Sequence, residues 1–479
     1  MTEKDELKTV ILKELFYKWS GIEAGKVAPL PPSGSYRKYF RLTGGNYTAM
    51  GAMNPDTREN NAFIAISKHF RKAGIRVPEI YLYQPEDQLY LLEDLGDKTL
   101  IDFLTRDHQR VFNQDVIRVY KQTLSDLIRI QFLGIKGLDT SVCYPRAEFD
   151  EQSVLWDLNY FKHYFLKFAK VKFDEQFLED DFRKFARFLA QVPRDYFLYR
   201  DFQSRNIMLH NDALYYIDYQ GGRRGALQYD VASLLFESKT FLPFEAREEL
   251  LAHYVGELEK EFKVPPEEFL RYYPGFLLIR LLQAMGAYGF RGLHENKPLF
   301  LESIPGALKN LEYILGHYSL GIELPELTTA LKLLGSDPFL NSIGSKHETF
   351  TLRIKSFSFK SGIPFDESLN GGGFVFDCRS LPNPGRFDEY KEMTGKDAPV
   401  IAFLEEKPEV SEYLNHVFAL ADNAIHDYRA RGHANMMISF GCTGGRHRSV
   451  YCAEQLYAHV RHTLGVDAVC SHLNLMDNM

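Results

Sequence analysis

The sequence predicts an α+β protein built from a two-lobed N-terminal part, residues 1–335, and a smaller α/β domain, residues 348–479. The chain of 479 residues is longer than one typical hydrophobic core accommodates. Strand-like alternation dominates residues 36–95, whereas apolar residues recur every three or four positions over much of residues 100–190. Beyond residue 348 strand and helix patterns alternate, which is typical of an α/β unit.

The first lobe is predicted to be a small sheet with one inserted helix. Strand patterns cover residues 36–45, 46–53, 77–84 and 88–95, and a helical pattern covers residues 61–74. These elements account for nearly all of the strand-like sequence before the helical region begins.

The second lobe is predicted to be mostly helical, with patterns such as VIRVYKQTLSDLIRIQFLG and GFLLIRLLQAMGAYGF continuing to about residue 335. Two short apolar strands interrupt it around the sequence YRDFQSRNIM. Residues 336–347, SDPFLNSIGSKH, contain Pro338 and Gly344 among polar residues, so we expect a linker there.

Composition limits the classes of function. No apolar run approaches the roughly 20 residues of a membrane span, so we expect a soluble protein without a membrane partner. The N-terminus lacks the basic start and apolar core of a signal peptide, which favours the cytoplasm. Five scattered cysteines without a CxxC pair fit neither a disulfide framework nor a zinc site. A net charge of −7 argues against the whole chain being a nucleic-acid binder, although a local basic patch stays open.

The stretch YRDFQSRNIM places Asp201 and Asn206 in a D-x-x-x-x-N spacing, and Asp218 follows the next apolar strand in YYIDYQGG. An acid, an amide and a second acid in this order suit phosphoryl transfer, because one carboxylate can accept a hydroxyl proton while the other two groups hold Mg²⁺. We therefore predict Asp201 as the catalytic base and Asn206 and Asp218 as metal ligands. A loop acid that caps a helix is the alternative reading of the D-x-x-x-x-N spacing taken alone.

The motifs GSYRKYFRL, YLLEDLGD, YRDFQSRNIML, IDYQ and YDVASLL follow one another along the chain. Together they resemble the aminoglycoside phosphotransferase family over roughly residues 10–335, and within it the kinases of N-acetylmuramate and N-acetylglucosamine (AmgK). The resemblance implies a two-lobed, protein-kinase-like fold and an ATP- and Mg²⁺-dependent kinase that acts on the anomeric hydroxyl during cell-wall recycling.

The resemblance also implies roles for particular residues. The turn from Gly34 to Arg41 covers the phosphates, Glu93 to Leu95 form the hinge that meets adenine, and Asp230 braces the catalytic loop. The predicted nucleotide-binding residues are Gly34, Ser35, Arg37, Lys38, Arg41, Glu93 and Leu95.

The chain departs from the general kinase pattern in its third strand, NYTAMGAM, which has no lysine to meet the phosphates. A phosphate clamp needs a positive charge, for which Arg37, Lys38 and Arg41 are the candidates. An inactive kinase-like scaffold is the alternative.

The segment LWDLNYFKHYF resembles the family stretch that lines the sugar pocket. Trp156, Asp157 and Tyr160 are therefore predicted substrate contacts, together with Arg205 of the catalytic loop. Aromatic rings stack on the apolar face of a sugar while an acid binds its hydroxyls. Burial in an aromatic helix face is the alternative for Tyr160.

Near the C-terminus, SFGCTGGRHRS runs from an apolar strand through glycines and basic residues into a helix predicted to begin at Ser449. Backbone N–H groups at a helix N-terminus and flanking arginines predict an anion site. The spacing from Cys442 to Arg448 also matches the C-x5-R-S loop of cysteine phosphatases, in which the thiol pKa is depressed. A purely structural turn is the third reading.

The stretches GFVFDCRSLPNPGRF, MTGKDAPVIAFLE and ISFGCTGGRHRSVYCAEQL resemble the C-terminal domain of RapZ, the RNase adapter protein, over roughly residues 348–472. The resemblance implies a site for a phosphorylated amino sugar such as glucosamine 6-phosphate, and it leaves room for an oligomer formed through this domain. Gly385 replaces the usual histidine, and no Lys or Arg follows Arg461, which argues against RNA as a partner. The implied phosphosugar-binding residues are Asp377, Arg379, Thr443, Gly444, Gly445, Arg446, His447, Arg448 and Ser449.

Both parts of the sequence thus indicate amino-sugar chemistry. The leading hypothesis is a kinase of N-acetylmuramate or N-acetylglucosamine joined to a domain that binds an amino sugar phosphate. The alternatives are a kinase of another small hydroxylated molecule, an RNA-binding adapter with an inactive kinase lobe, and phosphatase action at Cys442.

Overall fold

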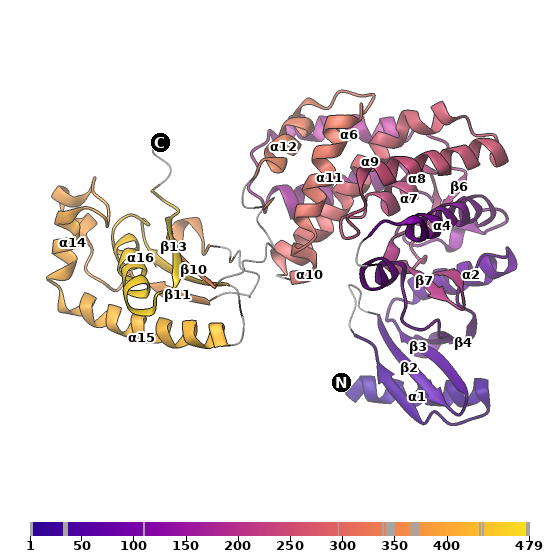
Figure 1. The fold of residues 1–479 in the computed structure, drawn as a ribbon, viewed down its shortest axis with the longest axis horizontal. Coiled ribbons are helices and arrows are strands. Elements are labelled where there is room, and N and C mark those ends of the chain that lie inside the picture. Colours follow the sequence, from indigo (N-terminus) through magenta and orange to yellow (C-terminus); the bar gives the residue numbers. More distant parts are fainter. Residues whose placement is uncertain are drawn as a thin grey trace. The chain divides into compact units, whose positions relative to one another are not determined.

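The computed structural model describes residues 3–31, 37–108, 111–295, 297–337, 340–341, 350–364, 366, 373–430, 433 and 435–475. The chain divides into two compact units, Met1–Phe290 with Gly306–Ser336, and Arg291–Pro305 with Asp337–Met479 (Figure 1). The domain boundaries drawn from the sequence, with the linker at residues 336–347, stay predictions, and most of that linker lies outside the described residues. Among the helices described, none combines the length and the apolar character needed to cross a membrane.

After its first helix, the first unit contains an antiparallel sheet in the order β1-β2-β3-β5-β4. This confirms the predicted small sheet with one inserted helix, to which the structure adds the unpredicted strand β1. Its core forms where Leu12 and Phe16 of the first helix meet Leu42, Ala49 and Leu91 of the sheet. Asp56 caps the second helix by accepting from the N–H groups of its first turn. The elements are α1 Glu3–Ser20, β1 Lys26–Pro29, β2 Lys38–Gly44, β3 Tyr47–Met53, α2 Thr57–Lys72, β4 Ile80–Gln84 and β5 Leu89–Glu93.

The rest of the first unit is mostly helical, which confirms the prediction for this region. Two two-stranded antiparallel sheets interrupt the helices, β6 (Tyr196–Leu198) with β9 (Arg223–Gly225), and the hairpin of β7 (Ile207–His210) with β8 (Ala213–Tyr216). Helix α9 packs on α5 and α7 and is buried along most of its length (Figure 1). The helices are α3 Leu100–Asp102, α4 Gln114–Leu133, α5 Glu151–Phe161, α6 Glu175–Leu189, α7 Gln228–Leu235, α8 Phe244–Glu257, α9 Pro266–Tyr288, α11 Ile304–His317 and α12 Pro325–Gly335. The short helix α10, Pro298–Leu301, lies in the stretch assigned to the second unit.

The second unit contains a parallel sheet in the order β11-β12-β10-β13, which confirms the predicted α/β organisation. Every residue of its inner strand β12 is buried, as expected for a parallel strand flanked on both sides. Helix α16 follows β12 directly and begins at Arg448, one residue before the predicted start. The elements are β10 Thr351–Ser358, β11 Gly373–Asp377, α14 Ala398–Glu405, α15 Pro408–Ala430, β12 Asn435–Cys442, α16 Arg448–His459 and β13 Asp467–His472.

Candidate functional site

The predicted base and metal ligands come together around the side chain of Asn206. The β7–β8 hairpin returns the chain to its start, so that the Ile217 N–H donates to the Asn206 carbonyl (3.0 Å). Asn206 Nδ2 donates to the backbone carbonyl of Asp201 (2.8 Å) and lies 3.3 Å from Asp218 Oδ2. The Asn206 amide therefore links the backbone of Asp201 to the carboxylate of Asp218.

A buried carboxylate fixes the backbone just ahead of Asp201. Asp230 of α7 accepts from the N–H groups of Tyr199 (2.7 Å) and Arg200 (3.0 Å), which confirms its predicted bracing role. Burial raises the pKa of Asp230 to about 7, while those two hydrogen bonds and the charge of Arg280 oppose the shift. Arg200 adopts a left-handed conformation (φ 82°), which a residue with a side chain adopts only when its surroundings hold it.

Asp157, predicted as a sugar contact, pairs with the catalytic-loop segment. Its two oxygens accept from Arg200 at 2.7 and 2.6 Å, so the carboxylate orients the residue before Asp201. Trp156 is 49 % exposed, with the Arg146 guanidinium 5.3 Å from its ring centroid. Tyr160 lies against Gly286 of α9. The role of these three side chains as substrate contacts stays a prediction.

Among the predicted phosphate-binding cations, Arg37 is the one that is buried and paired with a carboxylate of helix α2. It is 5 % exposed, and its guanidinium lies 3.0 Å from the Glu59 carboxylate of α2 and donates to the Tyr39 hydroxyl (3.1 Å). Arg41, in contrast, pairs with Asp94 (2.7 Å) and Asp97 (2.8 Å). Arg41 therefore ties β2 to the segment after β5, and its charge is already matched by two carboxylates.

The other predicted nucleotide-binding residues are distributed along the same lobe. Glu93 ends β5, and its carboxylate accepts from the Glu79 N–H (3.0 Å). The Leu95 carbonyl lies 3.0 Å from His210 Nδ1. Lys38 is exposed at the start of β2, and Gly34 and Ser35 lie outside the described residues.

The residue after Asp218 anchors that acid to the first lobe. Tyr219 stands at the position of phenylalanine in the kinase D-F-G motif and is fully buried. Its hydroxyl shares a 2.6 Å hydrogen bond with Ser67 of α2, and its ring stacks on Phe63 of the same helix. The position of α2 is thus coupled to the segment that carries Asp218.

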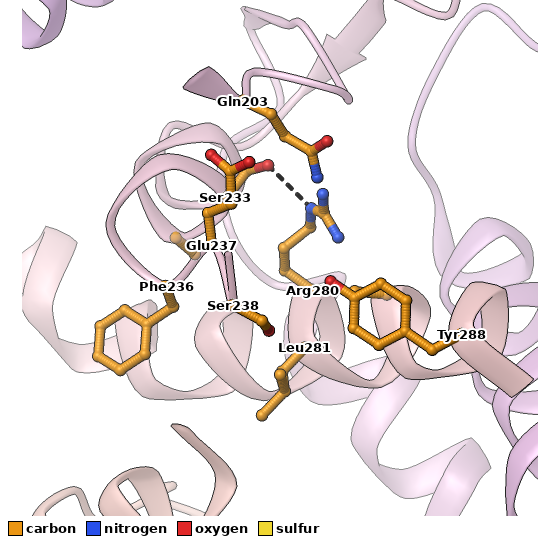
Figure 2. A pocket seen from close by; sticks show the side chains of 10 residues that line it. Gln203, Ser233, Phe236, Glu237, Ser238, Arg280, Leu281 and Tyr288 are labelled. Atoms are coloured by element: carbon orange, nitrogen blue, oxygen red, sulfur yellow. Dashed lines mark hydrogen bonds between the residues drawn. The ribbon is translucent and has the colours of Figure 1, made fainter. Parts of the chain in front are cut away.

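A small pocket adjoins the catalytic loop at Gln203 and continues between the end of α7 and helix α9 (Figure 2). The cavity itself is small, about 10 Å³, which is room for one small group, and the surrounding non-atom space of about 260 Å³ includes space open to solvent. Glu237 accepts from the Ser204 N–H (2.9 Å), which holds its carboxylate at the wall. The lining residues are Gln203, Ala232, Ser233, Phe236, Glu237, Ser238, Arg280, Leu281, Ala284 and Tyr288.

In the second unit, the turn between β12 and α16 exposes Thr443 and Gly444 and buries Gly445. Gly445 has φ 65°, and its N–H donates to Cys442 Sγ (3.2 Å). The Ser358 hydroxyl of β10 donates to the Thr443 carbonyl (2.7 Å), which fixes the turn from the neighbouring strand. The turn at the N-terminus of a 12-residue helix is thus a rigid backbone cradle.

The basic side chains of this turn are directed toward backbone carbonyls. Arg446 donates to the carbonyls of Met393 (3.0 Å) and Glu392, and His447 Nε2 lies 2.9 Å from the Tyr390 carbonyl. Arg448 donates to the carbonyls of Arg379 (2.8 Å) and Leu381 (3.0 Å). These residues therefore hold the segment between β11 and α14 against the turn.

At the end of β11, beside β12, Asp377 and Arg379 form an exposed ion pair (2.6 Å).

Burial alone would raise the pKa of Cys442, but hydrogen bonds with Ser449 and Gly445 lower it below its ordinary value, as the motif predicted. The thiol is only 3 % exposed, however, and Arg448 is bound to carbonyls. This geometry does not favour nucleophilic hydrolysis at Cys442.

Comparison with known families accounts for most of both units. Residues 26–268 match the phosphotransferase enzyme family, and residues 350–476 match the RapZ C-terminal domain. The chain belongs to the phosphotransferase enzyme family. The matched residues of this phosphotransferase include Asp201, Asn206, Asp218 and Asp230, whereas Arg280 and Tyr288 lie beyond them.

Curated relatives match the phosphotransferase chain over about a quarter of its length. A nucleotide-binding protein of Janthinobacterium sp. is 40 % identical over 119 residues, which are 25 % of this chain and 40 % of that protein. A nucleotide-binding protein of Fervidobacterium nodosum is 45 % identical over 109 residues, 23 % of this chain and 37 % of the relative. The match therefore spans about two fifths of each relative's length.

Solved structures similar to the phosphotransferase are distant in sequence. The ethanolamine kinase of Plasmodium vivax is 14 % identical with a TM-score of 0.43, covering 60 % of this chain and 82 % of its own. The choline kinase LicA of Streptococcus pneumoniae is 13 % identical with a TM-score of 0.43, covering 65 % and 99 %. Aminoglycoside phosphotransferase APH(4)-Ia is 15 % identical with a TM-score of 0.42, covering 65 % and 100 %.

Sequence reasoning missed two features of this phosphotransferase. The first is the ion pair between Arg37 and Glu59, since Glu59 was not considered. The second is the pocket around Arg280. Its signal in the sequence was a lone arginine in the apolar run GFLLIRLL, because an isolated charge in a buried helix requires a polar partner or a ligand.

Gly445→Ala should destabilise the second unit. A side chain there would be strained at φ 65°, and its Cβ would lie 2.6 Å from Asn474 Oδ1 and 2.8 Å from the Ser358 nitrogen. We expect a loss of about 2–4 kcal/mol in the free energy of unfolding. Hydrogen–deuterium exchange of peptides from β12 and α16 in the full chain measures this loss of stability. Gly444→Ala is the matched control, because its Cβ meets nothing within 4 Å, and equal exchange in the two variants would contradict the expectation.

Proposed function

We propose that this phosphotransferase is an ATP- and Mg²⁺-dependent kinase of a cell-wall amino sugar, N-acetylmuramate or N-acetylglucosamine, acting on the anomeric hydroxyl. The observation that supports it is that the Asn206 amide bonds both to the Asp201 backbone carbonyl and to the Asp218 carboxylate. In this assignment the Asp201 carboxylate accepts the proton of the sugar hydroxyl as its oxygen attacks the terminal phosphorus. The sugar oxygen gains the phosphoryl group and ADP leaves.

The oxygen atoms present suit a hard cation. Asn206 donates its Nδ2–H groups to the Asp201 carbonyl and to Asp218 Oδ2, so Oδ1 is the amide atom that would bind a metal. Asn206 and Asp218 would hold Mg²⁺, which supplies charge neutralisation for the nucleotide phosphates when bound. Gln220 donates to Asp218 Oδ1 (2.8 Å) and so fixes the orientation of that carboxylate.

Arg37 is the residue proposed to replace the missing third-strand lysine. In protein kinases that lysine pairs with a glutamate of the helix after the strand, and the pair positions the lysine on the phosphates. Arg37 makes an equivalent pair with Glu59 of α2 at 3.0 Å. It is buried near Tyr39 and Tyr90, which together with Glu59 favour its charged form despite burial and hold its pKa above the ordinary value.

The second unit is proposed to bind an amino sugar phosphate such as glucosamine 6-phosphate. The match to the RapZ C-terminal domain and the exposed backbone at Thr443 and Gly444 support this assignment. Asp377 and Arg379 lie on the adjoining strand end, where they can meet sugar hydroxyls and phosphate respectively. Residues 462–479 contain no Lys or Arg that could contact nucleic-acid phosphates, and RNA is not proposed as a partner.

Asp201→Asn should abolish turnover, because the amide cannot accept the hydroxyl proton. We expect kcat to fall by about 10²–10⁴-fold with nucleotide affinity unchanged. ADP release with each amino sugar measures turnover. Asp212→Asn, an exposed acid in the β7–β8 turn, is the control, and turnover equal to that control would refute the base assignment.

Arg37→Met should lower kcat/KM for ATP by about tenfold or more, because a buried positive charge near the phosphates is removed. Arg37→Lys should retain more activity than Arg37→Met, since it keeps the charge. The exposed Arg58 of α2 offers the control Arg58→Met. Equal kcat/KM values in Arg37→Met and the control, with normal circular dichroism, would assign the phosphate contact elsewhere.

Gly444→Ala should weaken binding of glucosamine 6-phosphate by about 10–100-fold, because its Cβ would obstruct the exposed N–H groups of the turn. Titration calorimetry on the full chain measures the affinity, and glucosamine serves as the ligand that lacks phosphate. Identical heats for glucosamine and its phosphate would show that the turn does not bind the phosphoryl group.

A further inference from the structure

Arg280 is a buried cation without a carboxylate partner. It is 5 % exposed in the middle of α9, where its Nε donates to the Ser233 hydroxyl (2.9 Å) and its Nη1 to Gln283 Oε1 (2.8 Å). Within the described stretches of the chain, its guanidinium makes no ion pair closer than 4.0 Å. Because a buried unpaired charge is costly, its presence in an apolar helix indicates that something else neutralises it.

The buried carboxylate of Asp230 already accepts two backbone hydrogen bonds. Asp230 feels the charge of Arg280, but its two oxygens accept from the backbone of Tyr199 and Arg200. Ser233 is neutral, and the Tyr229 ring lies 6.0 Å from the guanidinium carbon. The carboxylate of Glu237 also lines the pocket, but within the described part of the chain it forms no ion pair with Arg280 within 4.0 Å, so none of these contacts is a direct ionic partner of the guanidinium.

The free side of the guanidinium faces the pocket beside the catalytic loop. Figure 2 shows the guanidinium between the side chains of Gln203 and Tyr288, and a dashed line marks its hydrogen bond to Ser233. Gln203 follows Asp201 closely in the loop, so a substrate group bound at Arg280 would place the rest of its molecule next to the base. The position is therefore suited to substrate recognition.

The charges around the pocket specify which substrate group fits. Burial raises the pKa of Tyr288, while its hydrogen bond with Ser238 and the charges of Arg280 and Arg205 oppose the shift. Both arginines are therefore close enough to place positive charge at the side of the pocket formed by Tyr288. Glu237 offers one carboxylate, held by the Ser204 N–H. A buried guanidinium disfavours cationic substrates such as choline, ethanolamine and aminoglycosides, and favours a molecule that carries a carboxylate together with hydroxyl or amide donors.

We propose that Arg280 is the specificity-determining residue of the kinase and binds a carboxylate of the substrate. The inference rests on the proposed amino-sugar kinase function. N-acetylmuramate carries a lactyl carboxylate that N-acetylglucosamine lacks, and the two sugars otherwise share the anomeric hydroxyl and the acetamido group. Arg280 thus selects N-acetylmuramate, and Glu237 accepts from its hydroxyl or amide groups.

The experiment compares kcat/KM for the two sugars in the full-length protein with ATP and Mg²⁺, followed by ADP release. The wild type should prefer N-acetylmuramate. Arg280→Gln should lower kcat/KM for N-acetylmuramate by about 10–100-fold, mainly through KM, and change kcat/KM for N-acetylglucosamine by less than about threefold. Arg271→Gln makes the same chemical change at an exposed position of the same helix and should leave both values unchanged.

A substrate change tests the same contact without altering the fold. In the methyl ester of N-acetylmuramate the lactyl group is neutral. With the wild type, kcat/KM for the ester should be about 10–100-fold lower than for N-acetylmuramate. With Arg280→Gln, kcat/KM should be the same for the ester and the acid. Equal losses on both sugars in Arg280→Gln, full activity on the ester, or a wild type that prefers N-acetylglucosamine would overturn the inference and leave the kinase assignment standing. A wild type that phosphorylates neither sugar would overturn both.

Discussion

The catalytic loop depends on one buried carboxylate, that of Asp230. By accepting from two consecutive backbone N–H groups, it holds Arg200 in a left-handed conformation and sets the direction in which Asp201 leaves the β6 strand. The Arg200 side chain, displaced by that conformation, turns back to Asp157 and the Tyr229 hydroxyl. The left-handed backbone at Arg200, the buried Asp230 and the Arg200–Asp157 ion pair therefore form one arrangement, which fixes the backbone next to the proposed base before a substrate binds.

Local sequence was sufficient where the chemistry is local. Asp201, Asn206 and Asp218 were predictable because a short hairpin joins them, so their spacing nearly determines their proximity. The small sheet, the helical lobe and the parallel sheet followed from hydrophobic periodicity for the same reason. The glycines of the SFGCTGGRHRS turn were also informative, since Gly445 adopts a conformation that disfavours other residues.

Long-range pairing is what the sequence could not reveal. Asp157 resembled a sugar contact, but its partner Arg200 lies far along the chain and takes both of its oxygens. The sequence alone did not distinguish the three candidate cations Arg37, Lys38 and Arg41. The structure distinguishes them because Arg37 pairs with Glu59, whereas Arg41 pairs with Asp94 and Asp97. The basic residues at the start of α16 likewise suggested phosphate ligands, yet their donors meet carbonyls of residues 379–393.

The contacts of α2 have a mechanical consequence. This single helix carries Glu59, which holds Arg37, and also Ser67 and Phe63, which hold Tyr219 next to Asp218. A rigid-body shift of α2 would therefore displace the proposed phosphate cation and the proposed metal acid together. Readiness for catalysis would then be lost or regained in one concerted movement, with no intermediate in which only half of the phosphate-binding apparatus is assembled.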